Sequence, residues 1–119
     1  MLMKGDDNML NQVVLVGRLV RNIEIKESEN GKKYSNITLA VPRSFKNMNG
    51  EYETDFIDCT LWDNIAKNTM DYCKQGDVIA IKGRLQSSVY EVEDKKKHKL
   101  SVISEKVTFL SNKKQEADK

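Results

Sequence analysis

Two apolar, β-branched runs in this chain are each interrupted by a single glycine, in the stretches "VVLVGRL" (residues 13–19) and "VIAIKGRL" (residues 78–85). A glycine inside a strand often marks a bend or a bulge. Long strands that bend at Gly17 and Gly83 can coil around a small barrel. We therefore expect a strongly curved sheet.

Turn signals separate five expected strands. Asn30-Gly31 and Asn49-Gly50 are dipeptides that favour hairpin turns, and a run of charged residues is expected to form the last turn. The strands are expected at residues 11–22 (continued through 23–27), 34–45, 50–62, 78–93 and 100–111, with the charged turn at 94–99 and Pro42 ending the pairing or lying at an edge.

A single helix is expected between the third and fourth strands. Asp63 is a good helix N-cap, apolar residues recur after it at helical spacing, and Gly76 is placed to end the helix. This gives a helix of about three turns. The apolar positions are Ile65, Ala66, Met70 and Cys73.

The order strand, strand, strand, helix, strand, strand fits an all-β fold with one short helix. The best match is the OB-fold, a five-stranded Greek-key barrel, and a different small α+β fold is the alternative. We expect the barrel to occupy residues 10–111. Residues 1–9 are expected to be a disordered leader or an upstream start, and residues 112–119 a short polar tail.

Composition excludes several functional classes. Of the 119 residues 39% are hydrophobic and 32% charged, and the net charge of +2 permits a polyanionic partner without requiring one. Cys59 and Cys73 are too few to suggest a metal cluster, and His98 lies in a lysine run. Nucleophile elbows, Walker loops and paired-carboxylate motifs are absent from the sequence. We predict no cofactor, no metal site and no catalysis.

No stretch of the sequence approaches the roughly 18 apolar residues that a membrane-spanning helix needs. The first eight residues are too polar for a secretory signal. A soluble cytoplasmic protein with no membrane partner is therefore expected.

Alternation in the third strand assigns its side chains to two faces. The odd positions form an apolar face, whereas the even positions mix large rings with polar residues. The odd face consists of Ile57, Cys59 and Leu61, and the even face of Phe56, Asp58, Thr60 and Trp62. We expect the odd face to pack inside the barrel and the rings to stand in solvent.

The fourth strand repeats this arrangement. The core face is expected to carry Ile79, Ile81, Leu85 and Val89, and the polar face Lys82, Arg84, Gln86, Ser88 and Tyr90. Exposed rings beside cations suit single-stranded nucleic acid, because bases stack on the rings and the cations pair with phosphates. The rings could instead pack under a loop or in a subunit interface.

Four stretches in this order resemble the bacterial single-stranded DNA-binding protein (SSB) family: "NQVVLVGRL", "NITLAV", "TDFIDCTLW" and "GDVIAIKGRL". The resemblance covers about residues 10–111. It implies an OB-fold that binds single-stranded DNA without catalysis, as a homotetramer, in DNA replication, recombination, repair or competence. It also implies a cytoplasmic, nucleoid-associated protein encoded by a bacterium, phage or plasmid.

The resemblance implies four base-stacking positions: Phe45, Phe56, Trp62 and Tyr90. Alternation alone selects the last three, whereas strict alternation would place Phe45 toward the core. Tyr52 matches no stacking position and is expected at the rim. Because Asp58 would repel phosphate, we expect bases rather than backbone over that part of the strand.

Cations near the proposed face are the expected phosphate ligands: Arg18, Lys32, Lys33, Arg43, Lys46, Lys82 and Arg84. The hairpin lysines, Lys95, Lys96, Lys97 and Lys99, are either a solvated turn or DNA contacts.

Two features depart from the family pattern. Residues 86–88 are neutral where many members are basic, and the chain ends "KKQEADK" instead of in an acidic tip with a terminal Phe. We therefore do not expect tail-mediated recruitment of repair enzymes. The sequence looks more like a short accessory, competence, plasmid or phage form, or like a truncated chain. The alternative function is an OB-fold protein–protein interaction module, of the primosome-accessory type.

Overall fold

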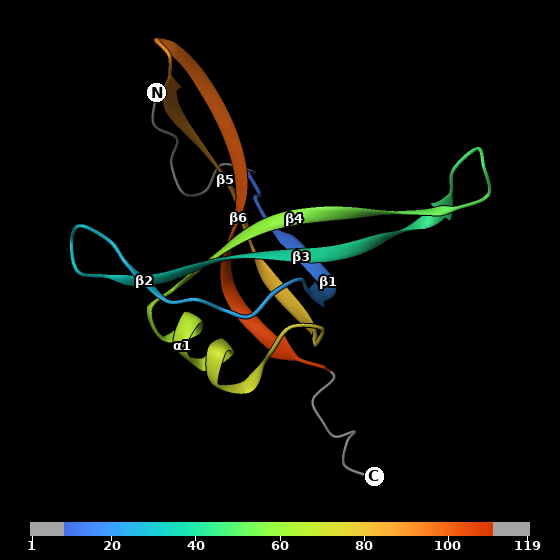
Figure 1. Cartoon of the computed structure of the whole chain (residues 1–119), viewed down its shortest axis with the longest axis horizontal. Helices are drawn as coiled ribbons and strands as arrows, with labels where there is room; N and C mark the ends of the chain where they lie inside the picture. The colour runs from blue at the N-terminus through green and yellow to red at the C-terminus, as the bar shows by residue number, and fades with distance from the viewer. Residues whose placement is uncertain (1–8, 111–119) are drawn as a thin grey trace.

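Six strands and one helix make up residues 9–110, the part of the chain that the computed structural model describes (Figure 1). The predictions for residues 1–8 and 112–119 lie outside the described residues. The strands are β1 (Val13–Leu19), β2 (Lys26–Glu27), β3 (Lys33–Lys46), β4 (Tyr52–Trp62), β5 (Val78–Val92) and β6 (Lys95–Phe109), with helix α1 (Asp63–Tyr72) between β4 and β5.

Five of these strands close into a barrel. The strand order is β1-β5-β6-β4-β3, and β1 also pairs with β3, which joins the two ends of the sheet. The pairings are antiparallel except for β4 with β6, which run parallel over only two residue pairs. The predicted five-stranded OB barrel with one short helix is confirmed. Strand β2 is a two-residue addition to the edge of β3.

The two internal glycines lie where the barrel backbones approach most closely. A Cβ on Gly17 would lie 2.7 Å from the carbonyl oxygen of Ala40, and a Cβ on Gly83 would collide with the carbonyl oxygen of Ile103. The pairing of β5 with β6 also shifts register between Lys82 and Gly83. The predicted bend or bulge is therefore confirmed at Gly83, and both glycines also lie where another backbone comes close, which the sequence did not predict.

The expectation that the first strand continues to residue 27 was wrong. Strand β1 ends at Leu19, and the chain leaves the sheet until Lys26. Loop contacts satisfy the backbone around this break, because Gly76 donates to the Leu19 carbonyl and Gln75 donates to the Asn22 side chain. Ile23 is buried although it lies outside any strand, so burial alone explains its apolar character.

The hairpin turns differ in how well the sequence predicts them. Gly31 and Gly50 have left-handed φ angles of 84° and 78°, as the two Asn-Gly signals predict. The charged turn expected at residues 94–99 is shorter and earlier: Glu93 and Asp94 form it with φ angles of 53° and 65°. The lysines after it therefore belong to strand β6.

Helix α1 is ten residues long, as expected, but its ends differ from the prediction. Trp62 is its N-cap, and Asp63 is the first helical residue with no side-chain cap. The helix ends four residues before Gly76, which has a φ of 94° in the turn that leads to β5. Met70 is exposed rather than packed on the barrel, since the helix buries Ala66 and Thr69.

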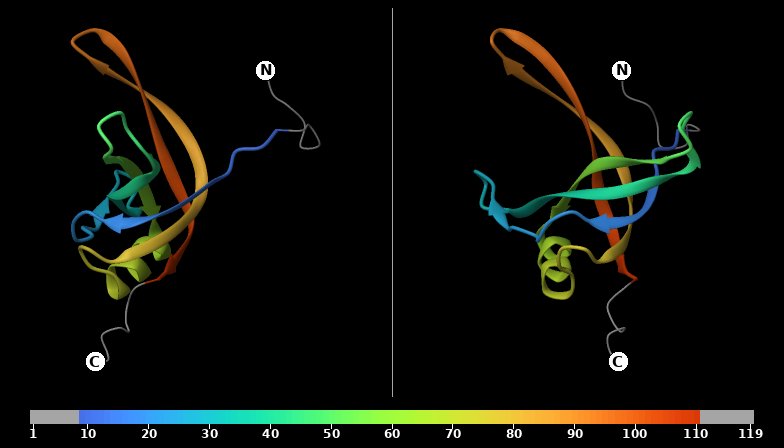
Figure 2. Two further views of the ribbon diagram at one scale, coloured as in Figure 1. Left: turned by 90° about the vertical axis from the view of Figure 1, so that its right-hand side faces the viewer. Right: turned by 45° about the vertical axis from the view of Figure 1, so that its right-hand side comes forward.

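The barrel interior holds the apolar faces of the paired strands, as alternation predicts for β4. Its largest fully buried apolar side chains are Leu19, Leu39, Leu61, Ile79, Ile81 and Val102. Leu85 and Val89 were also predicted to face the core, but they are 43% and 56% exposed. The cause is that the β5–β6 hairpin extends well beyond the barrel, so its apolar side leaves the core behind (Figure 2).

Replacing Gly83 with alanine should destabilise the barrel, because the new methyl group collides with the backbone of β6 rather than with a flexible side chain. We expect a loss of about 1–3 kcal/mol in the free energy of unfolding, measured by urea denaturation. Gly50→Asn is the control, since nothing lies within 4 Å of an added Cβ there and Asn tolerates a left-handed turn. Equal losses for both variants would contradict the close-approach explanation.

Candidate nucleic-acid interface

Four cross-strand pairs of β3 and β4 form one row on the outside of the barrel. In order they are Tyr34 with Trp62, Asn36 with Thr60, Thr38 with Asp58 and Ala40 with Phe56. Directly paired residues share a face of the sheet. The row therefore has aromatic rings at both ends and polar side chains in the middle. We call this row, with the adjoining side of the β5–β6 hairpin that carries Tyr90, the ring face.

Phe56 projects into solvent because its partner across the sheet is small. The residue opposite is Ala40, and Phe56 remains 67% exposed. Phe45 is 64% exposed, which places it outside the barrel. The regular pairing of β3 with β4 is interrupted between Pro42 and Lys46, so the alternation that would turn Phe45 inward does not continue. Pro42 was predicted to end the pairing or to lie at an edge; the pairing instead breaks after Pro42 and resumes at Lys46.

Trp62 is half-buried rather than free, because it packs against a second ring. The centroids of Trp62 and Tyr34 are 5.2 Å apart with an angle of 36° between the ring planes. Sequence reasoning missed Tyr34. The signal was available, since Tyr34 alternates with the core residues of β3 in the same phase as Asn36 and Thr38.

A groove runs beside Trp62, between the β2–β3 turn and strand β5. Lys32, Arg84 and Gln86 line it together with Trp62. Arg84 donates to the Gln86 side chain at 2.9 Å and faces Glu105 at 3.8 Å. Two of the predicted phosphate ligands, Lys32 and Arg84, therefore flank one of the predicted stacking rings.

Tyr90 lies on the protruding hairpin and is 47% exposed. Its cross-strand partner is Lys97, and the neighbouring pairs on the same side are Ser88 with Lys99 and Val92 with Lys95. Three of the four hairpin lysines thus share a face with Tyr90. Lys96 pairs with Glu91 on the other side of the hairpin. Of the neutral stretch at residues 86–88, only Ser88 faces a lysine, Lys99, across the hairpin.

Other predicted phosphate ligands lie apart from the rings. Lys33 forms an ion pair with Glu27 at 3.9 Å and lines a hollow beside helix α1. Arg18 donates a 2.9 Å hydrogen bond to the carbonyl of Gly76, next to the turn that leads to β5. Lys82 lies between Val14 of β1 and Lys106 of β6.

Arg43 is already paired with two carboxylates. Its guanidinium donates to Asp55 at 2.9 and 3.1 Å and to Glu53 at 2.8 Å. The hydrogen bond to Asp55 raises the pKa of Arg43, and the same bond from Arg43 lowers the pKa of Asp55 below its usual value. Among the predicted phosphate ligands, Arg43 therefore has its charge directly balanced by neighbouring acids.

Lys46 and Tyr52 meet across the end of the β3–β4 hairpin. The Lys46 ammonium lies 5.7 Å from the centre of the Tyr52 ring, within the range of a cation–π contact. Both residues lie close to the exposed Phe45 in sequence, at the end of the ring face.

The two thiols have the properties of packing groups rather than nucleophiles. Burial is the main cause that raises the pKa of Cys59 to about 12 and that of Cys73 to about 11. Both thiols therefore stay protonated at neutral pH. Within residues 9–110, no group of three or more His, Cys, Asp or Glu side chains is arranged to hold a metal ion. Helix α1, the one helix in that range, is too short and polar to cross a membrane.

Comparisons with known proteins agree with this arrangement. A family model described as "Single-strand binding protein family" matches residues 10–110. The chain is 40% identical over 109 residues to single-stranded DNA-binding protein B of Bacillus subtilis, covering 91% of this chain and 96% of that protein. It is 42% identical over 103 residues to the single-stranded DNA-binding protein of Bacillus cereus, covering 86% of this chain but only 61% of that protein.

A solved structure has the same fold. It is described as "Plasmodium falciparum SSB complex with ssDNA", and its similarity to this chain has a TM-score of 0.75. The sequence identity is 22%, and the match covers 88% of this chain and 98% of the other. The likeness extends over the whole barrel and supports the OB-fold.

The bond between Arg43 and Asp55 should be visible in the titration of the Asp55 carboxyl group. Because the pKa of Asp55 is lowered in the folded state, the bond adds stability above the unfolded pKa and loses it as the pH falls through the folded pKa. In Arg43→Gln the pKa of Asp55 should rise toward its usual value, measured by NMR titration. Lys46→Gln removes a charge from the same hairpin and is the control. An Asp55 pKa that is unchanged in Arg43→Gln would contradict this cause.

Proposed function

This chain belongs to the single-strand binding protein family, and from that premise we propose that its ring face binds single-stranded DNA. Bases stack on Phe45, Phe56, Trp62 and Tyr90, while Lys and Arg side chains contact the phosphates. The observation that carries the proposal is the exposure of Phe56 on an otherwise polar sheet face, where hydrophobic burial gives no reason for a large ring.

Phe56 and Trp62 are spaced so that a single DNA strand crossing the barrel contacts both rings. Phe56 and Trp62 are six residues apart on one strand, which is about 20 Å. Tyr34 packs against Trp62 and holds its ring in place. A ring that is already held loses less conformational entropy when a base stacks on it. The polar middle of the row lies between Phe56 and Trp62, under the path of the DNA strand.

The candidate phosphate ligands fall into two groups that differ in their share of phosphate binding. Lys32 and Arg84 beside Trp62, and Lys95 and Lys97 beside Tyr90, lie close to stacking rings. Lys33, Arg43 and Arg18 are bound to acids or backbone elsewhere, as described above. We assign the first group the larger share of phosphate binding, and Lys46 and Lys82 a lesser one.

Binding of this kind does not depend on sequence, because every base has a face that can stack. We assign the chain a non-catalytic role that protects single-stranded DNA during replication, recombination, repair or competence, in the cytoplasm. The family match and the DNA-bound structural relative favour this function over a primosome-type interaction module.

Homotetramer formation is part of the proposal. Val14 and Val16 are exposed on β1, and Leu85, Val89 and Leu100 are exposed on the hairpin. Leu85, Val89 and Leu100 share one side of the hairpin, and exposed apolar side chains that lie together are typical of surfaces that other protein chains cover. Further copies of this chain would bury them.

Stacking on Phe56 should be measurable through Trp62, the single tryptophan of the chain. Oligo-dT should quench the Trp62 fluorescence of the wild-type protein. Phe56→Ala should weaken binding by about 1–3 kcal/mol, the usual contribution of one stacked base. Tyr72→Ala removes an exposed ring on helix α1 and is the control, since Tyr72 packs on Phe109 rather than lying on the ring face. Unquenched Trp62, or equal affinities of the two variants, would refute the proposal.

Lys32 and Lys33 offer a test of the phosphate contacts, because adjacent lysines point to different sides of the barrel. For single strands the logarithm of affinity falls with the logarithm of salt concentration by about 0.7 for each phosphate neutralised. Lys32→Ala should reduce this slope by about that amount. Lys33→Ala should leave the slope unchanged, since Lys33 pairs with Glu27 beside α1. The reverse ranking would place the DNA on the helix side.

A further inference from the structure

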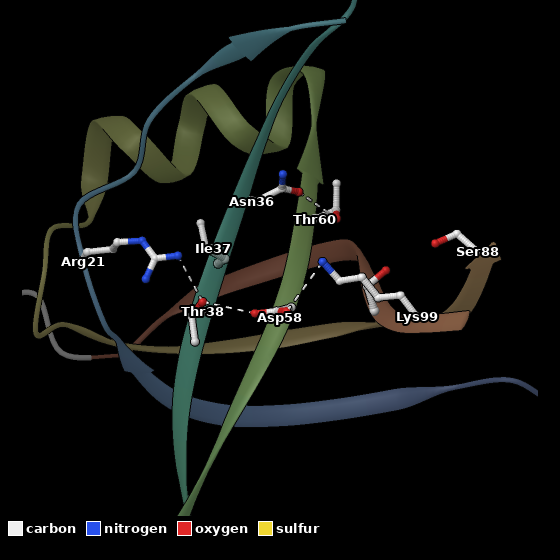
Figure 3. Close-up of a pocket in the computed structure, with 9 residues that line it drawn as sticks. Arg21, Asn36, Ile37, Thr38, Asp58, Thr60, Ser88 and Lys99 are labelled. Atoms are coloured by element: carbon white, nitrogen blue, oxygen red, sulfur yellow. Dashed lines mark hydrogen bonds and ion pairs between the residues drawn. The ribbon is translucent and has the colours of Figure 1, made fainter. Parts of the chain in front are cut away.

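A polar hollow of about 370 Å³ opens on the ring face, where the β5–β6 hairpin separates from strand β4 (Figure 3). It lies between the rings of Phe56 and Trp62, at the middle pairs of the row. Strand β3 contributes Asn36 and Thr38, strand β4 contributes Asp58 and Thr60, and the hairpin contributes Ser88 and Lys99.

The side chains of this hollow form two sets of polar contacts. Arg21 donates to the Thr38 hydroxyl at 3.3 Å, and Thr38 donates to Oδ1 of Asp58 at 3.2 Å. Thr60 donates to the Asn36 side chain at 3.2 Å. Asp58 therefore has one oxygen fixed by Thr38, while its other oxygen, Oδ2, faces the opening (Figure 3).

The contact of Oδ2 is weak and replaceable. The Lys99 ammonium lies 3.8 Å from it, which is longer than a hydrogen bond, and both side chains are about half exposed. Exposed ion pairs of this kind contribute little to stability. A ligand that donates hydrogen bonds to Asp58 can thus displace Lys99 without disturbing the fold.

Charge and chemistry limit what that ligand can be. Asp58 itself repels phosphate, so the group that it binds is not the DNA backbone, whereas the two cations of the hollow, Arg21 and Lys99, can attract that backbone nearby. The hollow contains no aromatic ring, so it cannot stack a base and can only contact the edge of one. In single-stranded DNA the Watson–Crick edges of the bases are free for such contacts.

A carboxylate only accepts hydrogen bonds, and it has two oxygens side by side. Guanine alone among the four bases has two adjacent N–H donors on its Watson–Crick edge, at N1 and N2. Thymine has one N–H group between two carbonyl oxygens, and both of these oxygens are repelled by a carboxylate. Cytosine and adenine have an amino group next to an unprotonated ring nitrogen, which also repels it.

Resting on the proposed binding of single-stranded DNA by the ring face, we propose that Asp58 binds the Watson–Crick edge of guanine. The two N–H groups donate to the two carboxylate oxygens, and Thr38 keeps its bond to Oδ1. Lys99 is released from Asp58 and becomes available to a phosphate of the same strand. The chain therefore prefers guanine at one position of its otherwise sequence-tolerant site.

The test compares oligo-dT strands that carry a few well-separated guanines with matched strands in which inosine replaces each guanine. Inosine keeps the N1 donor but lacks the N2 amino group, so the two strands differ only in the contact at issue. The wild-type protein should bind the guanine strand about fivefold more tightly than the inosine strand. In Asp58→Asn this ratio should fall to one.

Asp71→Asn is the matched control, because it removes one carboxylate from the exposed side of helix α1, away from the ring face. It should keep the guanine preference of the wild type. Equal binding of the guanine and inosine strands by the wild type, or an unchanged ratio in Asp58→Asn, would overturn the inference and leave the proposed function standing. Failure of the wild type to bind oligo-dT would overturn both.

Discussion

The register between β3 and β4 is the constraint on which the rest of the molecule depends. It pairs Ile37 with Cys59 and Leu39 with Ile57 on the inner face, and Ala40 with Phe56 and Tyr34 with Trp62 on the outer face. A shift of one residue would move every side chain of a strand to the opposite face. One set of backbone hydrogen bonds therefore decides both which side chains fill the barrel and which stand on its outer face.

Much of this arrangement could be predicted from the sequence, because it follows from local rules. Alternation in β4 identifies the buried and exposed sides correctly, and the internal glycine of β5 predicts the irregularity at Gly83. Alternation failed at Leu85 and Val89 for a physical reason. A strand keeps its two faces after it leaves the barrel, but the core that would bury one of them is no longer there.

Contacts between distant segments could not be read from the sequence. The pairing of Arg43 with Asp55 and the separation of Lys32 from Lys33 depend on how the hairpins curve around the barrel. The hairpin lysines show the same limit. In the sequence they suggest a solvated turn. In the structure the turn consists of only two residues, Glu93 and Asp94, so β6 is longer and the lysines align beside Tyr90.

The protruding hairpin also creates a risk of edge-to-edge aggregation, which the closed barrel avoids. After Gly83 on β5 and before Val102 on β6, the pairings that the structure describes are those between these two strands. Beyond Leu85, whose backbone N–H and C=O groups bond to the Asn11 side chain, each strand therefore has an open edge that another chain could extend into a larger sheet. Closely spaced lysines at residues 95–97 and 99, with Glu91 and Glu93 opposite, discourage such edge-to-edge aggregation. The same charges that can attract DNA thus help to keep the protein soluble.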